Sequence, residues 1–421
     1  MKLKTLSTAI LLATVPMTGA FAAAMDRSGQ SISAFLQPGN YFEAGISVLD
    51  PNVSGTASTA LGGQSTGDMA GDYYFPSAAL KLQVTDNFSF GLLYDQPFGA
   101  EADYTSQSIA FNPTGTDGTS AEVKTENLTF LLGFQPTQNW NIYAGPVYQT
   151  AKGNVSLRGA AYSALNGYDA NMKKDSELGW IAGLAYQIPE IALKASLTYR
   201  SEIEHELATI ETGLIPALPI PGVGIFPLPA YVAGDTNVTT PQSVNLDFQT
   251  GIMENTVAFA NVRWVNWDGI AIRPNSFGQA LDGLAVIGAN LPAAPALAPT
   301  KANLESLNGG NLVEYNKDQW SATAGVGRKF SEKWAGNVSV GWDSGAGNPI
   351  TTLGPTEGYW NLGLGLQFSP APNYFIAGGV KYFWLGDAKA QVASDFGTDS
   401  YVADFGDNDA LAYGLKIGYR F

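Results

Sequence analysis

Cysteine is absent from this chain of 421 residues, and histidine occurs only once, as His205. Without thiols the protein can have no disulfide framework and no thiolate-ligated metal or iron–sulfur site. A single imidazole also argues against a histidine-rich zinc site and against a Ser-His-Asp triad. We therefore expect no enzyme activity, no metal and no cofactor, and we expect His205 to be an ordinary strand-end or loop residue.

Charged side chains are also scarce. They make up 14% of the chain, against about 25% in an ordinary globular protein. The 22 Lys and Arg residues are outnumbered by 37 Asp and Glu residues, which gives a net charge of −15. Such an acidic chain is unsuited to the phosphate backbone of nucleic acids. With 45% hydrophobic residues, the chain can bury enough apolar surface that intrinsic disorder is also excluded.

Long apolar runs are missing beyond the N-terminus, so no transmembrane helix is expected. At the N-terminus, Lys2 and Lys4 precede a short apolar stretch, which is followed by small residues in an A-x-A pattern. This order of parts is typical of a secretory signal peptide. We predict a signal peptide over residues 1–24, with cleavage after Ala22 or after Ala24.

The chain instead has a strict alternation of apolar and small or polar residues. In the last segment, Leu411, Tyr413, Leu415, Ile417, Tyr419 and Phe421 share one face, and small or charged residues occupy the other. A period of two is the signature of a β-strand that lies between two different environments. The segment Tyr359–Phe368 repeats this pattern, with glycines on its second face.

The same pattern recurs along the chain, with short turns and long loops in alternation. Short turns at one end and long loops at the other are typical of an outer-membrane barrel. Aromatic residues such as Trp264, Trp267, Trp334, Trp342 and Trp360 gather near strand ends, where interfacial girdles are expected. The sequence predicts an all-β fold: a transmembrane antiparallel barrel over residues 40–421, preceded by a short N-terminal plug over residues 25–39. About fourteen strands are expected, over residues 40–50, 73–85, 87–98, 121–135, 140–158, 175–188, 191–210, 240–254, 256–272, 314–330, 333–344, 357–369, 373–392 and 408–421.

Four stretches resemble the FadL family of outer-membrane transporters for long-chain fatty acids and other hydrophobic compounds. Leu197–Glu202 reads LTYRSE and resembles the family's TYRSE strand. The other stretches are residues 240–246 with 262–267, residues 315–320 with 342–344, and residues 360–389. The resemblance implies a fourteen-strand barrel in which a ligand is captured in an extracellular apolar groove, moves to a pocket in the lumen, and leaves sideways through an opening at a kink in the third strand. The N-terminal hatch of the family, with its NPA motif, has only the short residues 25–39 as its counterpart here.

Each part of this mechanism has candidate residues. The resemblance places head-group cations near Arg158 and Lys317, and Arg200 lies in the TYRSE motif. For each cation, a solvated or paired structural charge is the alternative. The kink is expected at Gln96, Pro97, Phe98 and Gly99, because proline cannot donate to a strand ladder; the alternative is that the strand simply ends there. The plug would use Met25, Ile32, Phe35 and Leu36.

The groove candidate is an unusually apolar and proline-rich loop, since large exposed apolar patches mark binding or membrane sites. The alternative is a loop that folds into the lumen or dips into lipid. Its expected contacts are Leu214, Ile215, Leu218, Ile220, Val223, Ile225, Phe226 and Leu228, with Tyr162 and Leu165 of a facing loop.

The sequence thus predicts an outer-membrane protein of a Gram-negative bacterium that carries fatty acids or other hydrophobic small molecules. The expected partners are the hydrophobic ligand, outer-membrane lipids and, through the C-terminal Phe421, the barrel-assembly machinery; no nucleic acid is expected, and the protein should be a monomer. Two alternatives remain open at this point: a general diffusion porin for polar solutes, and a structural or adhesin barrel.

Overall fold

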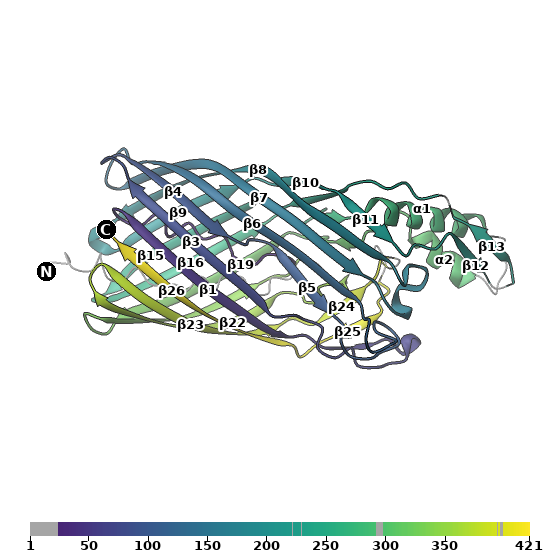
Figure 1. Ribbon diagram of the computed structural model, residues 1–421. Coiled ribbons are helices and arrows are strands. Elements are labelled where there is room, and N and C mark those ends of the chain that lie inside the picture. Colours follow the sequence, from purple (N-terminus) through teal and green to yellow (C-terminus); the bar gives the residue numbers. More distant parts are fainter. Residues whose placement is uncertain (1–23, 221, 229, 292–297, 394, 396–398) are drawn as a thin grey trace.

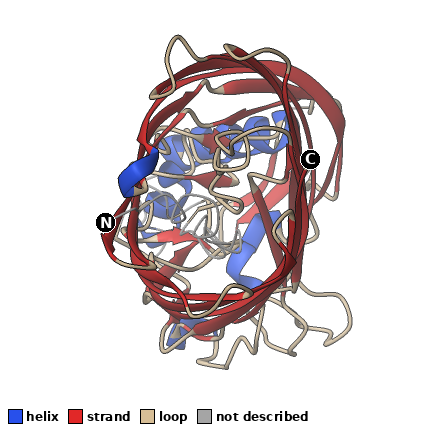
Figure 2. Cartoon of the chain, turned by 90° about the vertical axis from the view of Figure 1, so that its left-hand side faces the viewer, coloured by secondary structure: helices blue, strands red, loops and turns tan. Residues whose placement is uncertain are grey.

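Fourteen antiparallel strands form one closed barrel in the computed structural model, which describes all residues except 1–23, 221, 229, 292–297, 394 and 396–398 (Figures 1 and 2). The main sheet has 16 strands, but β5 (Gly99–Asp103) continues the line of β4 and β11 (Thr209–Thr212) only extends the tip of β8. The first and last wall strands close the barrel, with Tyr41 to Asn52 paired to Arg420 to Asp409. The wall strands are β1 (Tyr41–Asn52), β3 (Tyr73–Gln83), β4 (Phe88–Asp95), β6 (Ser120–Phe134), β7 (Trp140–Ser156), β8 (Asp169–Ile188), β9 (Leu193–Arg200), β15 (Ser243–Met253), β16 (Thr256–Val265), β19 (Gln319–Lys329), β20 (Trp334–Asp343), β22 (Tyr359–Ala371), β23 (Tyr374–Leu385) and β26 (Asp409–Arg420).

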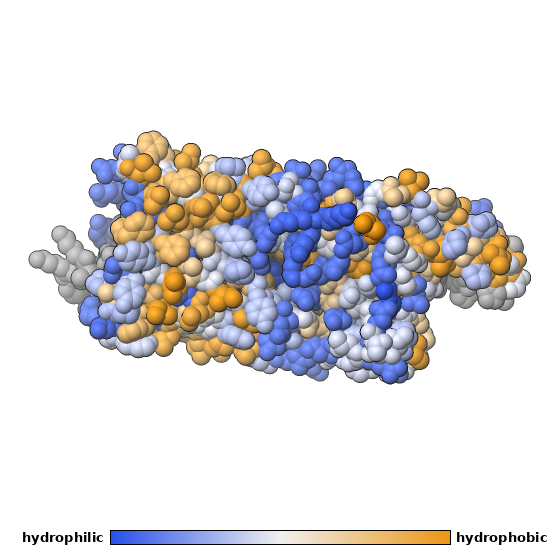
Figure 3. Space-filling view, viewed as in Figure 1, coloured by the Kyte–Doolittle hydropathy of each residue, from blue (hydrophilic) through white to orange (hydrophobic). Residues whose placement is uncertain are grey.

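The two alternating faces of each wall strand become the inner and the outer surface of the barrel. In β26, Leu411 and Leu415 are exposed on the outer face, whereas Ala412 and Lys416 are buried toward the lumen. On the face seen in Figure 3, apolar side chains gather in a band over the half of the barrel near the C-terminus, and hydrophilic residues cover much of the wall beyond it. The band is the part of the wall that suits lipid, and the longer strands carry the barrel past it.

Aromatic side chains are aligned across neighbouring strands at the borders of the apolar band. Trp264 pairs with Trp320 on adjacent strands. In the same way, Trp342 lies opposite Trp360, which in turn lies opposite Trp384. Rings at matching levels of several strands form a girdle at the membrane surface, as predicted for an outer-membrane barrel. Trp267 is an exception, because its side chain is fully buried inside the molecule.

The long loops lie at the end opposite the C-terminus, and they contain helices that the strand pattern did not predict (Figure 1). Helix α1 (Asn275–Asn290) and helix α2 (Ala298–Ser306) pack together within the segment between β16 and β19. Neither helix, nor any other in the described part of the chain, is long and apolar enough to cross a membrane. Beside them project β12 (Ala217–Ile220) and β13 (Gly224–Pro227), which form a hairpin at the tip of the molecule (Figure 1).

The predicted strand over residues 191–210 is divided. β9 ends at Arg200, and β10 (Ile203–Leu207) leaves the wall to pair with β14 (Thr236–Thr240) in a separate ribbon. The ribbon packs against the inner face of β7 and β8, where the side chain of Ile203 lies against Gly179. The sequence could not show this, because a ribbon with one buried face has the same period of two as a wall strand.

Candidate functional site

The residues just after the predicted signal peptide lie inside the barrel; the peptide itself falls on residues 1–23, outside the described part of the chain. We call residues 24–40 the N-terminal segment. Its four predicted plug residues, Met25, Ile32, Phe35 and Leu36, are each at least nine-tenths buried. Phe35 contacts the ring of Tyr143 at 5.7 Å between centroids, and its ring fills the space beside Gly91 and Gly133 of the wall. These four predicted plug residues therefore occupy the lumen, and their role in gating remains a prediction.

Polar contacts attach the N-terminal segment to strands around the barrel. Asp26 forms an ion pair with Arg263 at 2.7 Å, and the carbonyl of Gly29 accepts a hydrogen bond from Asn245. At the other end, the carbonyls of Leu36 and Gln37 accept hydrogen bonds from Lys194 and Lys81. The segment thus divides the lumen into an upper part toward the loops and a lower part toward the termini.

The upper part contains an apolar cavity of about 50 Å³, which we call the upper cavity. Its lining includes Met25, Met69, Tyr73, Met172 and Tyr315. A smaller adjoining cavity shares Met25 and Met172 and adds Phe98, Leu207, Val238 and Trp267. Aliphatic, thioether and aromatic side chains dominate both linings, as expected for a pocket that binds an apolar ligand.

Aromatic rings fix the shape of this region. Trp267 lies edge-on to Phe98, with 5.7 Å between ring centroids, and 4.9 Å from Tyr315. Its indole N–H donates to Gln319, which in turn donates to Asp343. The prediction that Trp267 belongs to a membrane girdle is wrong, because its side chain lines a lumen cavity. Trp267 lies two residues beyond the last residue of β16, where the chain has turned over the lumen. A strand pattern cannot predict such a turn.

The lower part of the lumen has a different chemistry. A cavity of about 170 Å³ there is lined by charged side chains such as Lys194, Asp247 and Lys416, and also by the apolar side chains of Leu36, Phe259 and Phe375. Lys416 forms an ion pair with Glu43 at 3.3 Å. This part of the lumen therefore combines buried charged groups with apolar surface, whereas the lining of the upper cavity has fewer charged side chains.

The third wall strand is interrupted at the residues predicted for the kink. β4 ends at Asp95, β5 begins at Gly99, and Gln96, Pro97 and Phe98 lie between them. β3 pairs with β4 only from Ala78 onward, and β5 pairs with β6 but not with β3. The wall therefore lacks a continuous ladder between Tyr73–Ser77 and residues 96–101. An isolated bridge between Ala70 and Ala102 closes this break at its upper end.

The N-terminal segment takes the place of the missing neighbour inside the barrel. The backbone N–H of Arg27 donates to Pro97 O at 2.6 Å, and Gly99 N donates to Met25 O at 2.8 Å. The guanidinium of Arg27 also donates to Gly99 O and lies 4.0 Å from the ring centroid of Tyr73. The interruption and the N-terminal segment are thus hydrogen-bonded to each other, so that movement of one affects the other.

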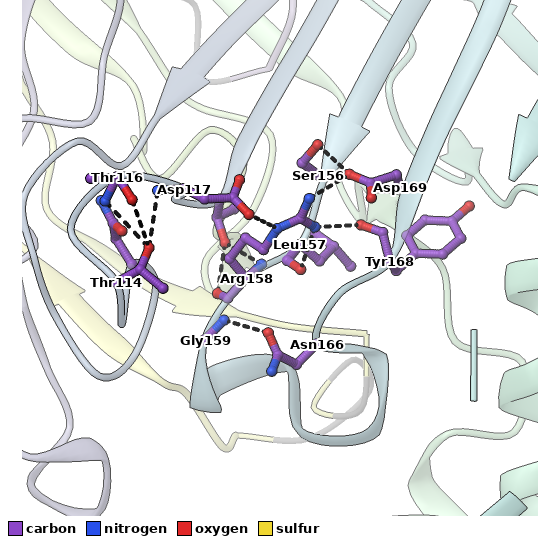
Figure 4. Close-up of polar contacts among 12 residues, drawn as sticks. Thr114, Thr116, Asp117, Ser156, Leu157, Arg158, Gly159, Asn166, Tyr168 and Asp169 are labelled. Carbon is purple, nitrogen blue, oxygen red and sulfur yellow. Dashed lines mark hydrogen bonds and ion pairs between the residues drawn. The ribbon is translucent and has the colours of Figure 1, made fainter. Parts of the chain in front are cut away.

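The three predicted head-group cations lie in three different places. Arg158 forms ion pairs with Asp117 and Asp169, both at 2.8 Å, in the loops above β7 (Figure 4). Burial opposes its charged form, but the hydrogen bonds that Arg158 donates to these two carboxylates raise the pKa of Arg158. Lys317 is exposed between β18 (Val313–Glu314) and β19. Only Arg200 of the three lies in the lumen, where it donates to the carbonyl of Gln30.

The apolar loop predicted for the groove is the hairpin of β12 and β13, residues 214–228, which we call the apolar hairpin. Ile225 is 75% exposed at its tip, while Ile220 and Leu228 are buried. Leu214, Ile215, Leu218, Val223 and Phe226 are partly buried against the core. The chain that follows the hairpin contacts α1, since the carbonyl of Val232 accepts a hydrogen bond from Asn275.

The loop predicted to face this hairpin has its two expected contact residues buried, and it does not present them to the hairpin as an open groove would. Tyr162 and Leu165 are 5% exposed, and the hydroxyl of Tyr162 lies 2.9 Å from that of Thr352. Burial raises the pKa of Tyr162 to about 12. These two residues belong to the packed loops over the barrel mouth, and a ligand would reach them only through that packing.

His205 is a buried residue of the inward ribbon. Its two ring nitrogens lie 3.0 Å from a carboxylate oxygen of Asp175 and 3.0 Å from Gln149. The carbonyl oxygen of Gln149 also accepts a hydrogen bond from Thr240 of β14. His205 thus fastens the ribbon to β7 and β8. Across the described residues, no group of three or more His, Asp or Glu side chains is placed to hold a metal ion.

Comparison with known structures supports this architecture. A FadL homologue of Pseudomonas aeruginosa is 15% identical, with 92% of each chain covered and a TM-score of 0.65. The toluene transporter TodX of P. putida is 13% identical over 92% of this chain and 91% of its own, with a TM-score of 0.59. The toluene transporter TbuX of Ralstonia pickettii is 12% identical over 96% and 98%, with a TM-score of 0.56. At such identities, these likenesses show the fold alone.

No curated protein matches the chain in sequence. A family model does match, over residues 22–421, and it describes outer membrane transport proteins of the OMPP1/FadL/TodX type. This range covers the whole barrel and the N-terminal segment. The chain is therefore a member of the OMPP1/FadL/TodX family of transport proteins, which function in the outer membrane of Gram-negative bacteria and are not enzymes.

Proposed function

We propose that this protein carries hydrophobic small molecules, such as hydrocarbons or fatty acids, from the extracellular side into the outer membrane. The apolar hairpin would capture the molecule, the upper cavity would hold it, and the break in the third strand would release it sideways into lipid. Two solved relatives in fold are toluene transporters, which supports an apolar cargo here.

The interruption of the wall beside an apolar cavity carries this proposal. Phe98 lies in the interruption and also lines the cavity that adjoins the upper cavity. A molecule held in that cavity would be next to residues 73–77 of β3, which have no paired strand on the side of β4. The cavity below has more charged side chains in its lining, among them Lys194 and Asp247, whereas the sideways path would lead directly into lipid.

The alternative of a general porin requires an open aqueous path through the lumen. The N-terminal segment lies across that path, with Phe35 and Ile32 buried against the wall. We therefore expect a small single-channel conductance in planar bilayers. A large, steady conductance would favour the porin. The adhesin alternative predicts no uptake of hydrophobic compounds at all.

Cross-linking the break tests the route directly, because the native chain has no cysteine. Ser77→Cys with Gln96→Cys places thiols on β3 and in the interruption, both lining one cavity. We expect a short thiol cross-linker to abolish uptake of labelled toluene and oleate in cells that lack their own transporter. The matched control is Val340→Cys with Leu362→Cys, a directly opposed pair in the intact wall. Full uptake in the cross-linked Ser77–Gln96 variant would rule out this exit.

A further inference from the structure

A cavity of about 580 Å³ lies at the end of the barrel that carries the short turns, which is the periplasmic end of an outer-membrane barrel. We call it the vestibule. It lies below the N-terminal segment, whose residues 36–39 form part of its lining. Polar side chains make up most of the rest, including the amides of Gln83, Asn87, Gln135, Gln138, Asn141 and Gln187. The vestibule therefore suits a hydrophilic ligand.

Three basic side chains contact the lower end of the N-terminal segment at the vestibule. Lys81 and Lys194 line the vestibule and donate hydrogen bonds to the carbonyls of Gln37 and Leu36. The Nη2 of Arg420 lies 3.5 Å from the side-chain oxygen of Gln37. Lys194 is close enough to Lys81 and Arg420 to be repelled by both charges. Three cations thus converge on two residues of the segment, in a chain whose net charge is −15.

None of these three cations forms an ion pair with a carboxylate in the described part of the chain. Lys416, higher in the lumen, is in contrast paired with Glu43. Asp247 attracts Lys194 from farther away, but its oxygens accept hydrogen bonds from Ser196 and Asn261. The one acid among the described lining residues of the vestibule is Asp86, which lies in an exposed turn, where solvent and salt screen its charge. The positive charge here therefore lacks a counter-ion.

Unused hydrogen-bonding groups accompany this charge. An ammonium group has three donors, and each lysine gives one of them to the segment, although Lys81 is only 2% exposed. The Nε of Arg420 is buried without a partner in the described part of the chain, and so is the Oδ1 of Asn141. Buried charges are costly unless they are paired, and native proteins rarely leave buried polar atoms unsatisfied. An oxyanion would supply the missing acceptors, and a hydroxyl group would supply a donor for Asn141.

We propose that the vestibule binds a small soluble molecule that carries a phosphate group and hydroxyl groups. Lys81 and Lys194 donate to the phosphate oxygens, Arg420 adds its charge, and the amide side chains face the hydroxyl groups. A phosphate ester has a charge of about −1.5 to −2 at pH 7 and three acceptor oxygens, so it balances more of this cluster than a single carboxylate does. Because the same cations hold Leu36 and Gln37, the bound ligand also holds the lower end of the N-terminal segment more firmly.

The test compares a sugar phosphate with the sugar itself. Binding of glucose 6-phosphate and of glucose to the full protein is measured by calorimetry in one non-ionic detergent at constant ionic strength. Glucose 6-phosphate should bind at least about tenfold more tightly, because its phosphate accepts charge-assisted hydrogen bonds. Lys81→Gln and Lys194→Gln should each weaken its binding about tenfold, since each removes a cation but keeps a hydrogen-bond donor. Lys333→Gln, at an exposed lysine in a turn at the same end of the barrel, is the matched control and should bind as the native protein does.

The site is refuted if the native protein binds glucose 6-phosphate no more tightly than glucose, or if the two lysine variants bind it as Lys333→Gln does. Dihexanoyl phosphatidate presents the same phosphate group on a lipid, and tighter binding of this lipid would overturn the assignment to a soluble ligand. Amide hydrogen exchange at Leu36 and Gln37 should slow when glucose 6-phosphate is bound; unchanged exchange would contradict the link to the segment. Uptake of toluene tests the proposed function separately, because the apolar cargo would bind on the other side of the segment.

Discussion

At the scale of single residues, glycines in the wall make room for an aromatic side chain of the N-terminal segment. A Cβ atom at Gly91 would lie 2.4 Å from the ring of Phe35, and one at Gly133 would lie 2.8 Å from it. Both glycines belong to wall strands, where glycine is otherwise unfavourable. Their use here makes room for an aromatic ring of the segment inside the barrel.

Gly91→Ala should therefore disturb the packing of Phe35. We expect a loss of about 1–3 kcal/mol in unfolding free energy, the usual cost of overpacking, measured by urea unfolding in lipid vesicles. Gly378→Ala is the matched control, because its nearest neighbour would be 3.6 Å away. Phe35→Ala in the Gly91→Ala background should relieve the clash. Equal stability of the two single glycine variants would contradict this account.

The carboxyl group of Glu357 makes the stability of the loop around it depend on pH. Glu357 lies outside the wall strands and accepts a hydrogen bond from the N–H of Gly347. Burial raises its pKa to about 6, above the ordinary value of about 4.3. The folded loop then binds the proton more tightly than the unfolded loop, so its stability is highest at low pH and falls as pH rises from about 4.3 to 6. We expect proteolysis of residues 345–358 to quicken over this range.

Glu357→Gln should abolish that change, because the amide keeps an acceptor for Gly347 but does not ionise. Glu332→Gln, at a turn residue whose side chain is 94% exposed, serves as the control and should behave as the native protein does. A native loop whose cleavage rate does not vary between pH 4 and pH 7, after correction for the protease, would refute the prediction.

At the scale of elements, the inward ribbon of β10 and β14 is the least expected feature. One buried residue, His205, joins it to β7 and β8 through Gln149 and Asp175. The exposed face of the same strand carries Glu204 and Glu206. The ribbon borders the apolar region of the lumen, since Leu207 and Val238 line the cavity that adjoins the upper cavity.

His205→Ala should loosen this ribbon without opening the wall. Two hydrogen bonds are lost, each of which contributes about 0.5–1.5 kcal/mol. Amide hydrogen exchange should become faster in Ile203–Leu207 and Thr236–Thr240, with no change in β9. Glu204→Ala, on the exposed face, is the matched control. If exchange in the ribbon is the same in both variants, His205 does not hold it.

Sequence patterns predicted the wall more completely than they predicted the loops and lumen. Each expected wall strand has its counterpart, because lipid outside and a polar lumen inside impose a strict period of two. Residues 273–313 were expected to form only a loop, yet they contain α1 and α2. The two helices are stabilised by packing against each other, for example where Gly288 of α1 lies against Leu304 of α2, and no local pattern predicts such contacts.

The candidate site was predictable only where one residue type has a strong backbone preference. Pro97 cannot donate to a ladder, and the interruption does fall at this residue. The ion pair between Asp26 and Arg263 joins residues 237 positions apart, and nothing in either local sequence indicates it. Two of the three expected head-group cations, Arg158 and Lys317, lie outside the lumen. Their positions depend on how the loops fold, and the periodicity of the sequence does not predict loop folding.

At the scale of the whole molecule, the apolar band sets where the protein lies in the membrane. Leu364 is 55% exposed within the band on β22. Leu364→Arg should destabilise the barrel by about 2–4 kcal/mol, as arginine does on the lipid face near the bilayer midplane. Ser176→Arg, on the polar part of β8 beyond the band, should have little effect. Urea unfolding of the two variants in lipid vesicles tests this prediction. If their unfolding midpoints are similar, the apolar band is not the part of the wall that faces lipid.

The closed wall also imposes an order on assembly. The N-terminal segment enters the lumen directly before β1, and β1 completes the barrel by pairing with β26 along its whole length. The segment is held from the inside by Arg263, Asn245, Lys194 and Lys81, which belong to four different strands. The contacts of the segment are therefore complete only when β3, β9, β15 and β16 all stand in the wall, so the last part of assembly includes the seating of the first residues of the barrel.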